Sequence, residues 1–323
     1  MRILYFGTGE FAEPAFQALL DAGTHQVVGL VTNPDRPSGK GKHLEMERGI
    51  KRIALARNVA LFQPENVNTP ESMERIKQFD AELFVVAAYG QFLSRDLLSV
   101  PRLGAINIHA SLLPKYRGAA PINWAIYHGE TETGITIFRI TPQMDAGEMI
   151  AKATLPIEPI DTAGSLEEKL APLGARLAVE TVDRLAAGPV KGETQSPAMV
   201  SKAPKLEKEY GLIDWTKHAA QVERQIRAMQ PWPTAYAYLH NAVLGSSLRL
   251  IVFRAVVLPE TTNQPPGAVI RVSKDQLAIA CGGGSMIGLL EVHPAGKKRQ
   301  PIAEFLKGHR IDVGDRFGGE TKG

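Results

Sequence analysis

The sequence is poor in the features that mark secreted, thiolate-bound or membrane proteins. It has one cysteine, Cys281, in 323 residues, which excludes an internal disulfide and any metal site built from several thiolates. No apolar run approaches the roughly 20 residues of a membrane span. The apolar start at residues 2–6 is too short, and too soon broken by glycine, for a signal peptide. We therefore expect a cytoplasmic protein without a membrane segment, and no metal site is predicted.

Length and composition indicate an ordinary globular protein with more than one core. Hydrophobic residues make up 44% of the chain and charged residues 22%, as in typical soluble domains. A chain of 323 residues is long for one compact core, so two domains are predicted.

The net charge of +3 is unevenly distributed. Residues 1–200 carry 20 Lys and Arg against 23 Asp and Glu, a balance of −3, whereas residues 201–323 carry 17 against 11, a balance of +6. A basic second half suggests a polyanionic partner, with nucleic acid the first candidate. A lysine-rich solvated surface would show the same balance.

The first half follows a strand, turn, helix, strand order. An apolar strand at residues 2–6, a helical pattern at 14–22 and a strand at 27–32 form a βαβ unit, which predicts an α/β domain with a parallel, doubly wound sheet. Gly7, Gly9 and Ala12 approximate a dinucleotide fingerprint, but no acidic residue ends the second strand. We therefore interpret the glycines as turn residues, and a nicotinamide cofactor is the weaker hypothesis.

The same alternation continues to about residue 187. Strands are expected at 83–88, 104–108 and 134–140, and helices at 70–78, 119–128 and 165–187. From 188 to 208 the chain is rich in Pro, Gly, Ser and Lys, which indicates a linker. A helix at 219–229 and short strands at 235–239, 248–257, 268–272, 277–280 and 287–292 then predict a small antiparallel barrel. The expected domains are 1–187 and 209–317.

The segment 106–114 is the strongest candidate for chemistry. In a strand, side chains alternate between faces, so Asn107, His109 and Ser111 share one side. An imidazole can handle a proton near neutral pH, and an amide can donate a hydrogen bond to an oxygen that becomes negative. A polar pair satisfied within the sheet is the structural alternative.

Asp145 follows a second apolar strand and precedes Ala-Gly, a common turn sequence. The carboxyl ends of strands in an open α/β sheet meet at one edge, where ligands bind. We expect Asp145 to reach His109 there and to favour its protonated form.

Basic residues gather in two places. Arg36, Lys40 and Lys42 lie in a loop after residue 33 that contains prolines and glycines, and such a loop could clamp a phosphate-bearing substrate or be an ordinary hydrophilic loop. In the second half, cations that could contact phosphates without reading bases include Lys205, Lys297 and Lys298. Trp232, between two prolines, is interpreted as a packing anchor.

Several motifs, in order, resemble those of the 10-formyltetrahydrofolate-dependent formyltransferases. They are NIHASLLP at 107–114, YRGAAP at 116–121, ETGIT at 132–136 and DAG at 145–147. Other segments resemble the branch of this family that acts on initiator tRNA: PDRP at 34–37 followed by GKG, IDW at 213–215, IRA at 226–228, PWP at 231–233 and PAGKK at 294–298. The likeness spans residues 3 to about 317.

The resemblance implies transfer of a formyl group from 10-formyltetrahydrofolate, as co-substrate, to the amino group of methionyl initiator tRNA. It implies a Rossmann-like catalytic domain with a doubly wound, mostly parallel sheet, a C-terminal OB-like barrel that helps hold the tRNA, and a monomer. Catalytic roles fall on Asn107, His109 and Asp145. Folate binding falls on Ser111, Leu112, Leu113 and Pro114. The basic loop matches the family's insertion that contacts the acceptor stem, although Lys40 stands where an arginine is expected, which keeps the charge but loses the bidentate geometry.

Other functions remain open on the sequence alone. The Asn, His and Asp core is shared by formyltransferases that act on amino sugar nucleotides or glycinamide ribotide, and a hydrolase of 10-formyltetrahydrofolate would share the co-substrate. A non-catalytic RNA-binding protein is the alternative outside enzymes. The balance of +6 in the second half favours tRNA over a sugar nucleotide.

Overall fold

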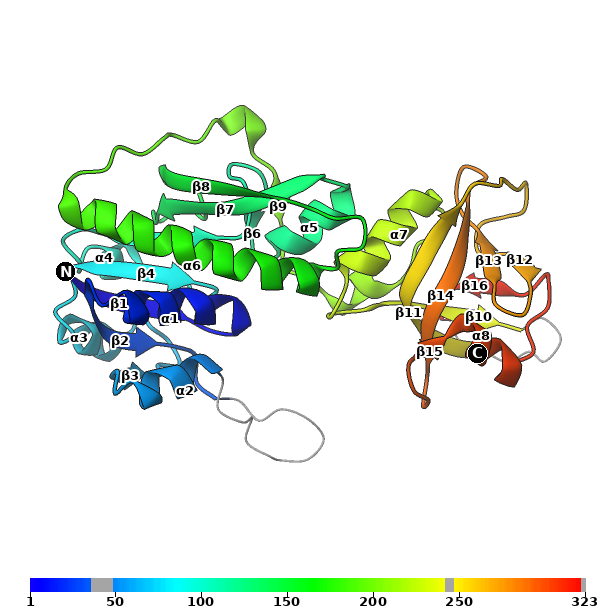
Figure 1. The fold of residues 1–323 in the computed structure, drawn as a ribbon, viewed down its shortest axis with the longest axis horizontal. Helices are drawn as coiled ribbons and strands as arrows, with labels where there is room; N and C mark the ends of the chain where they lie inside the picture. Colours follow the sequence, from blue (N-terminus) through cyan, green and yellow to red (C-terminus); the bar gives the residue numbers. More distant parts are fainter. Residues whose placement is uncertain (36–48, 242–246, 321–323) are drawn as a thin grey trace. The chain divides into compact units, whose positions relative to one another are not determined.

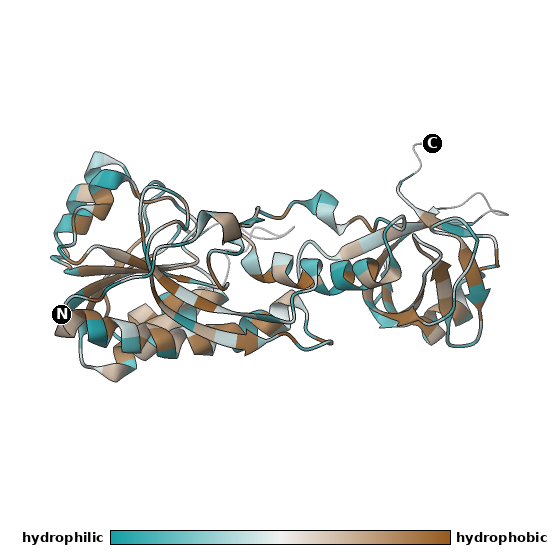
Figure 2. Cartoon of the chain, turned by 90° about the horizontal axis from the view of Figure 1, so that it is seen from above, coloured by the Kyte–Doolittle hydropathy of each residue, from teal (hydrophilic) through white to brown (hydrophobic). Residues whose placement is uncertain are grey.

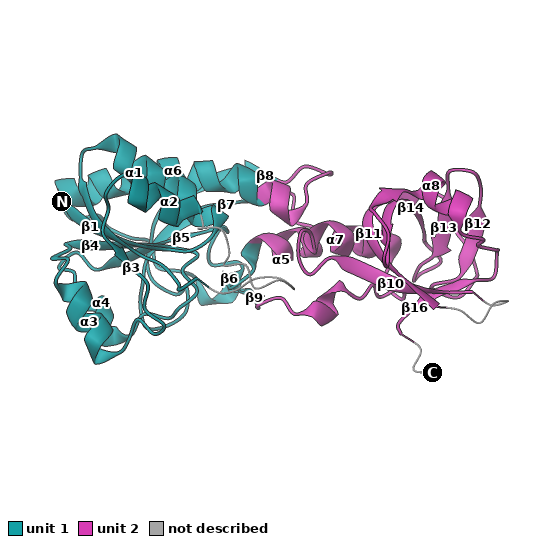
Figure 3. Cartoon of the chain, turned by 90° about the horizontal axis from the view of Figure 1, so that it is seen from below, with its two compact units in different colours: residues 1–121, 132–156, 167–204 teal, residues 122–131, 157–166, 205–323 magenta. Residues whose placement is uncertain are grey.

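The computed structural model describes residues 1–35, 49–241 and 247–320 and divides into two compact units (Figure 1). Unit 1 contains residues 1–121, 132–156 and 167–204, and unit 2 contains residues 122–131, 157–166 and 205–323 (Figure 3). The domain limits expected from the sequence stay predictions. Among the described residues, no helix has the length and apolar character needed to cross a bilayer.

Unit 1 is built on a seven-stranded sheet with the order β3-β2-β1-β4-β5-β7-β8. The first five strands in this order are parallel, whereas β7 is antiparallel to both β5 and β8. The strands are β1 (Arg2–Gly7), β2 (Gln26–Val31), β3 (Leu61–Phe62), β4 (Leu83–Ala87), β5 (Ala105–His109), β7 (Glu132–Arg139) and β8 (Met149–Pro156). The doubly wound, mostly parallel sheet expected from the sequence is confirmed.

Along the chain, helices separate or follow these strands. They are η1 (Glu10–Ala12), α1 (Glu13–Ala22), α2 (Gly49–Ala56), α3 (Pro70–Lys77), α4 (Arg95–Leu98), α5 (Pro121–His128) and α6 (Ala163–Ala187). Local sequence sets their ends: the Thr69 hydroxyl caps α3 by accepting from Ser72 N, and α1 ends where Gly23 takes φ +63°. In Figure 2 teal and brown alternate along the helices, as expected where one face of a helix packs inward.

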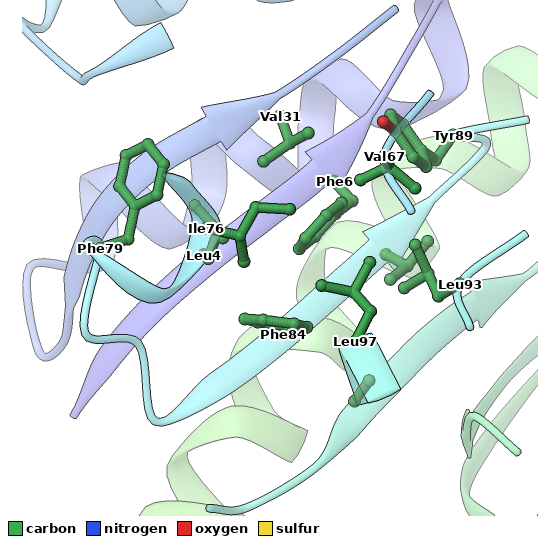
Figure 4. Close-up of a cluster of buried hydrophobic side chains, with 12 residues drawn as sticks. Leu4, Phe6, Val31, Val67, Ile76, Phe79, Phe84, Tyr89, Leu93 and Leu97 are labelled. Atoms are coloured by element: carbon green, nitrogen blue, oxygen red, sulfur yellow. The ribbon is translucent and has the colours of Figure 1, made fainter. Parts of the chain in front are cut away.

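Both faces of the unit 1 sheet are buried, as is usual for parallel strands. Leu4 and Phe6 of β1 lie on one face, in a fully buried cluster with Phe84 of β4 (Figure 4). The Tyr5 ring packs against Phe16 of α1, with 5.1 Å between the ring centroids. This packing fixes the strands rigidly, so the loops at their carboxyl ends start from defined positions.

Unit 2 contains an antiparallel barrel with the strand order β12-β13-β14-β11-β10-β16. A bridge between Ala268 and Arg316 connects the two outer strands, so the barrel is nearly closed. Its elements are η3 (Lys208–Gly211), α7 (Ala219–Ala228), β10 (Ala235–His240), β11 (Ser247–Leu258), β12 (Val269–Val272), β13 (Leu277–Ala280), β14 (Met286–Pro294), β15 (Gln300–Pro301), α8 (Ile302–Gly308) and β16 (Arg316–Gly318). The predicted C-terminal β-barrel is confirmed.

Candidate active site

His109 is the last residue of β5 and is only 6% exposed. Its Nε2 lies 2.9 Å from the main-chain oxygen of Tyr116. Because a carbonyl oxygen can only accept, Nε2 carries the hydrogen and donates it. Nδ1 is therefore the ring nitrogen that this contact leaves unbound.

Asp145 lies in the loop between β7 and β8 and faces this nitrogen. Its Oδ2 is 3.9 Å from His109 Nδ1, a distance too long for a hydrogen bond but short enough for strong attraction to an imidazolium. The same oxygen accepts a hydrogen bond of 2.8 Å from Gly118 N. The structure thus brings together the two side chains that the sequence places 36 positions apart.

Asn107 lies two residues before His109 on β5, opposite Phe138 of β7. Strand alternation directs its side chain to the same side of the sheet as His109, and Asn107 is half-buried. Across the described ranges, its side-chain amide has no hydrogen-bond partner. The amide N–H groups are therefore available to a bound substrate.

Burial and charge act in opposite directions on the imidazole. Burial lowers the pKa of His109 below its ordinary value, and the Asp145 carboxylate and the Tyr116 carbonyl offset part of that lowering. Burial thus favours the neutral form with hydrogen on Nε2, and Asp145 favours the form that carries a second hydrogen on Nδ1. Any proton that arrives at Nδ1 is stabilised mainly by Asp145.

The segment after β5 forms a tight turn held by internal hydrogen bonds. Ser111 is fully buried, and its hydroxyl donates to Lys115 O at 2.7 Å. Thr136 Oγ1 donates to Ser111 O at 2.7 Å and accepts from Leu113 N at 3.0 Å. Leu113 and Pro114 are buried and Leu112 is half-buried. The buried Ser111 hydroxyl therefore stabilises the turn through its hydrogen bond to Lys115 O.

Sequence reasoning missed Gln195, which lies in the stretch expected to be a linker. Its side chain is buried, and Nε2 donates to the main-chain oxygens of Asp145 and Gly147 at 2.8 Å each. Its Oε1 accepts from Arg117 Nε at 3.0 Å and Nη2 at 2.8 Å. No periodicity or motif marks Gln195, so the sequence offers no signal for this contact.

The same stretch is joined to the site by its main chain. β6 (Arg117–Gly118) pairs in parallel with β9 (Lys202–Ala203). Ser201 Oγ accepts from Tyr116 N at 2.9 Å, and Ser201 O accepts from Arg117 N at 2.9 Å. Residues 195–203 therefore belong to the structure around His109 and Asp145.

The structure describes three of the six basic residues that the sequence predicts to contact phosphates. Lys205, Lys297 and Lys298 are exposed in unit 2. Arg36, Lys40 and Lys42 lie outside the described residues. The expectation that Trp232 is a packing anchor is wrong, because it is 50% exposed, and the packing positions in unit 2 are taken by Trp124 and Trp215 instead, at 8% and 4%.

Two family models match the chain. The formyl transferase model matches residues 1–182, and the model of the formyl transferase C-terminal domain matches residues 205–310. The chain is 43% identical to a methionyl-tRNA formyltransferase of Geobacter sulfurreducens over 98% of this chain and 97% of that protein. It is 42% identical to the methionyl-tRNA formyltransferase of Methylococcus capsulatus, over 98% of this chain and 100% of that protein.

Solved structures of similar fold include folate complexes. An N-formyltransferase from Helicobacter canadensis, in complex with folinic acid and dTDP-3-aminofucose, has a TM-score of 0.64 at 16% identity, over 89% of this chain and 98% of that one. HypX from Aquifex aeolicus in complex with tetrahydrofolic acid has a TM-score of 0.59 at 17% identity, over 97% of this chain and 50% of that one. These likenesses concern the fold. Both domain models and the full-length relatives agree, and the chain belongs to the methionyl-tRNA formyltransferase family of formyl transferases.

Proposed function

We propose that the chain transfers the formyl group of 10-formyltetrahydrofolate to the amino group of methionyl initiator tRNA, for translation initiation. The observation that supports this proposal most strongly is the approach of His109 Nδ1 to Asp145 Oδ2, at 3.9 Å, with Asn107 two residues before His109 on the same strand. The names of the full-length relatives support tRNA as the acceptor.

Each of the three side chains has a separate role in the proposed acyl transfer. The amine nitrogen attacks the formyl carbon, the new C–N bond forms, and the formyl oxygen becomes negative. The Asn107 amide and a proton on His109 Nδ1 donate hydrogen bonds to that oxygen. Asp145 stabilises the charged imidazole and relays the amine proton through water to N10 of the folate as the old C–N bond breaks. His109 acts through Nδ1 because Nε2 is already bound to Tyr116 O.

The segment Ser111, Leu112, Leu113 and Pro114 is proposed to line the folate site. Because the Ser111 hydroxyl is bound to Lys115 O and Leu113 is 1% exposed, contact with the co-substrate falls on half-buried Leu112 and on main-chain atoms. The two folate complexes of similar fold support a folate co-substrate for this architecture.

The basic residues are proposed to bind the phosphates of the tRNA. Lys205, Lys297 and Lys298 are exposed, and the second half of the chain carries the net positive charge. Arg36, Lys40 and Lys42 are proposed to contact the acceptor stem. We further propose that the protein works as a monomer in the cytoplasm, where charged tRNA and folates meet.

Incubation of the protein with 10-formyltetrahydrofolate and charged initiator tRNA tests the proposal. We expect formyl-methionine on the tRNA, measured after base hydrolysis of the ester bond. A parallel reaction without tRNA measures formate, since a hydrolase would release it without an acceptor. Formylation of a dTDP-amino sugar in place of the tRNA would contradict the proposed acceptor, and no formyl transfer to any amine would contradict the enzyme.

A further inference from the structure

One buried side chain holds the main chain on both sides of Asp145. Gln195, 4% exposed, donates from Nε2 to Asp145 O and Gly147 O, each at 2.8 Å. Its other polar atom, Oε1, accepts two hydrogen bonds from the Arg117 guanidinium, at 3.0 and 2.8 Å. Both donor hydrogens and both acceptor lone pairs of this amide are therefore used by groups next to the site.

The conformation of Asp145 needs such support. Its φ of +48° is in the left-handed region, which non-glycine residues occupy rarely and which persists only where the surroundings determine it. Gly147, two residues on, packs closely, since a Cβ there would collide with Arg139 O. The loop has little room, and Gln195 supplies the hydrogen bonds that select this backbone.

The orientation of His109, which faces Asp145, depends on the same stretch of chain, residues 195–203. The oxygen that orients His109 belongs to Tyr116, and the N–H of Tyr116 donates to Ser201 Oγ at 2.9 Å. The β6 and β9 pairing ties residues 117–118 to residues 202–203. Thus one segment braces the loop that carries Asp145 and the loop that orients the imidazole.

We propose that Gln195 is a positioning residue for formyl transfer: by connecting Arg117 to the main chain of Asp145 and Gly147, it keeps the Asp145 carboxylate at the distance from His109 that the reaction requires. Gln195 acts through the loop that carries Asp145. The proposal rests on the proposed function for its kinetic readout, but its effect on His109 is measurable without catalysis.

The first test replaces the amide by an apolar group in Gln195→Leu. The variant loses both donations to the Asp145 loop, and displacement of reacting groups by about 1 Å can cost up to a hundredfold in rate. We expect kcat to fall by roughly tenfold to a hundredfold, with KM for tRNA and for 10-formyltetrahydrofolate within about twofold of the wild type. An unchanged kcat in a folded variant overturns the proposal.

The second test keeps the size and shape of the side chain. In Gln195→Glu the new carboxylate can still accept from Arg117 but cannot donate to the two main-chain oxygens. We expect the same fall in kcat as in the leucine variant, which separates the lost donations from lost packing. A kcat equal to that of the wild type would show that the two donations do not matter.

Nuclear magnetic resonance of carbon-13 labelled histidine measures the titration midpoint of His109, which a general loss of stability does not change. When the Asp145 carboxylate shifts away from His109, the imidazolium loses its main stabilising charge, so the titration midpoint of His109 should fall. The comparison uses Gln195→Leu, because the carboxylate of Gln195→Glu would itself raise the midpoint. An unchanged midpoint in Gln195→Leu, even with reduced kcat, overturns the proposal.

Gln225 is the matched control. It is 6% exposed, and its Nε2 donates to two main-chain oxygens, those of Tyr210 and Leu212, at 2.9 Å each, within unit 2. Gln225→Leu should lower thermal stability and leave kcat and the His109 midpoint unchanged. An equal fall of kcat in this control would overturn a specific role for Gln195. If the wild-type protein transferred no formyl group, the proposed function would be contradicted. The titration of His109 in Gln195→Leu would still decide the role of Gln195.

Discussion

His109 and Asp145 face each other across 3.9 Å, and each is held by the main chain of the same three-residue loop. Tyr116 O binds His109 Nε2, and Gly118 N binds Asp145 Oδ2. The loop thereby engages Nε2 of His109 and Oδ2 of Asp145, and it leaves Nδ1 of His109 without a main-chain partner. At that distance the Asp145 carboxylate attracts a proton on Nδ1 by its charge, without a direct hydrogen bond.

The pKa of His109 should depend on Asp145. Burial lowers it below 6.5, the ordinary value, and the carboxylate raises it. Asp145→Asn removes the charge, so we expect the midpoint to fall further, as measured by magnetic resonance of the imidazole carbons. A midpoint that rises or stays constant in the variant would contradict the assignment of Asp145 as the charged partner.

Removal of the Asn107 amide should slow the chemical step. Loss of one donor to a developing oxyanion typically costs about a hundredfold to a thousandfold in kcat. We expect Asn107→Ala to show a loss in this range with saturating substrates, measured as formyl transfer to charged tRNA. The exposed Asn263 provides a control, because Asn263→Ala should retain wild-type turnover. Near-normal turnover of the Asn107 variant would exclude the amide from this role.

Gly147 should be intolerant of any side chain. A Cβ there would collide with Arg139 O, so the loop that carries Asp145 must move. We expect Gly147→Ala to lower the free energy of unfolding by roughly 1–3 kcal/mol, seen as a lower midpoint of thermal unfolding. Gly308, at the end of α8, has open space where a Cβ would stand, with no atom from other parts of the described chain within 4 Å, and Gly308→Ala should not lower the midpoint. Equal midpoints for the two variants would refute the steric argument.

Binding of tRNA should weaken steeply as salt rises, since cations that contact phosphates release counterions. Replacement of Lys297 and Lys298 by alanine should reduce the slope of log affinity against log salt by about one unit per lost contact. The exposed Lys77 pairs with Glu74 in unit 1, and Lys77→Ala should leave the slope unchanged. Filter binding with initiator tRNA at several salt concentrations measures the slope for the double variant and for Lys77→Ala. An unchanged slope in the variant that lacks Lys297 and Lys298 would place the phosphate contacts elsewhere.

The fold was largely predictable because its signals are local. Hydrophobic runs and turn residues indicated the strands around Ile3, Ile106 and Ile135 as well as the helix that begins near residue 165. Five elements were missed: α2, β3, α4, β8 and α8. The two residues of β3 and the four of α4 are too few to show a period, whereas the alternation along β8 was a usable signal. The barrel was indicated by short strands with turns between them, which its antiparallel ladders explain.

The sequence by itself determined that Asn107 and His109 share a strand face, because the two-residue period of a strand is a property of the backbone. Only the tertiary structure decided which ring nitrogen is free, since the choice depends on Tyr116 O. It also decided that Gln195 lies beside Asp145. Contacts between residues 50 positions apart arise from chain packing, and no local period of the sequence encodes them.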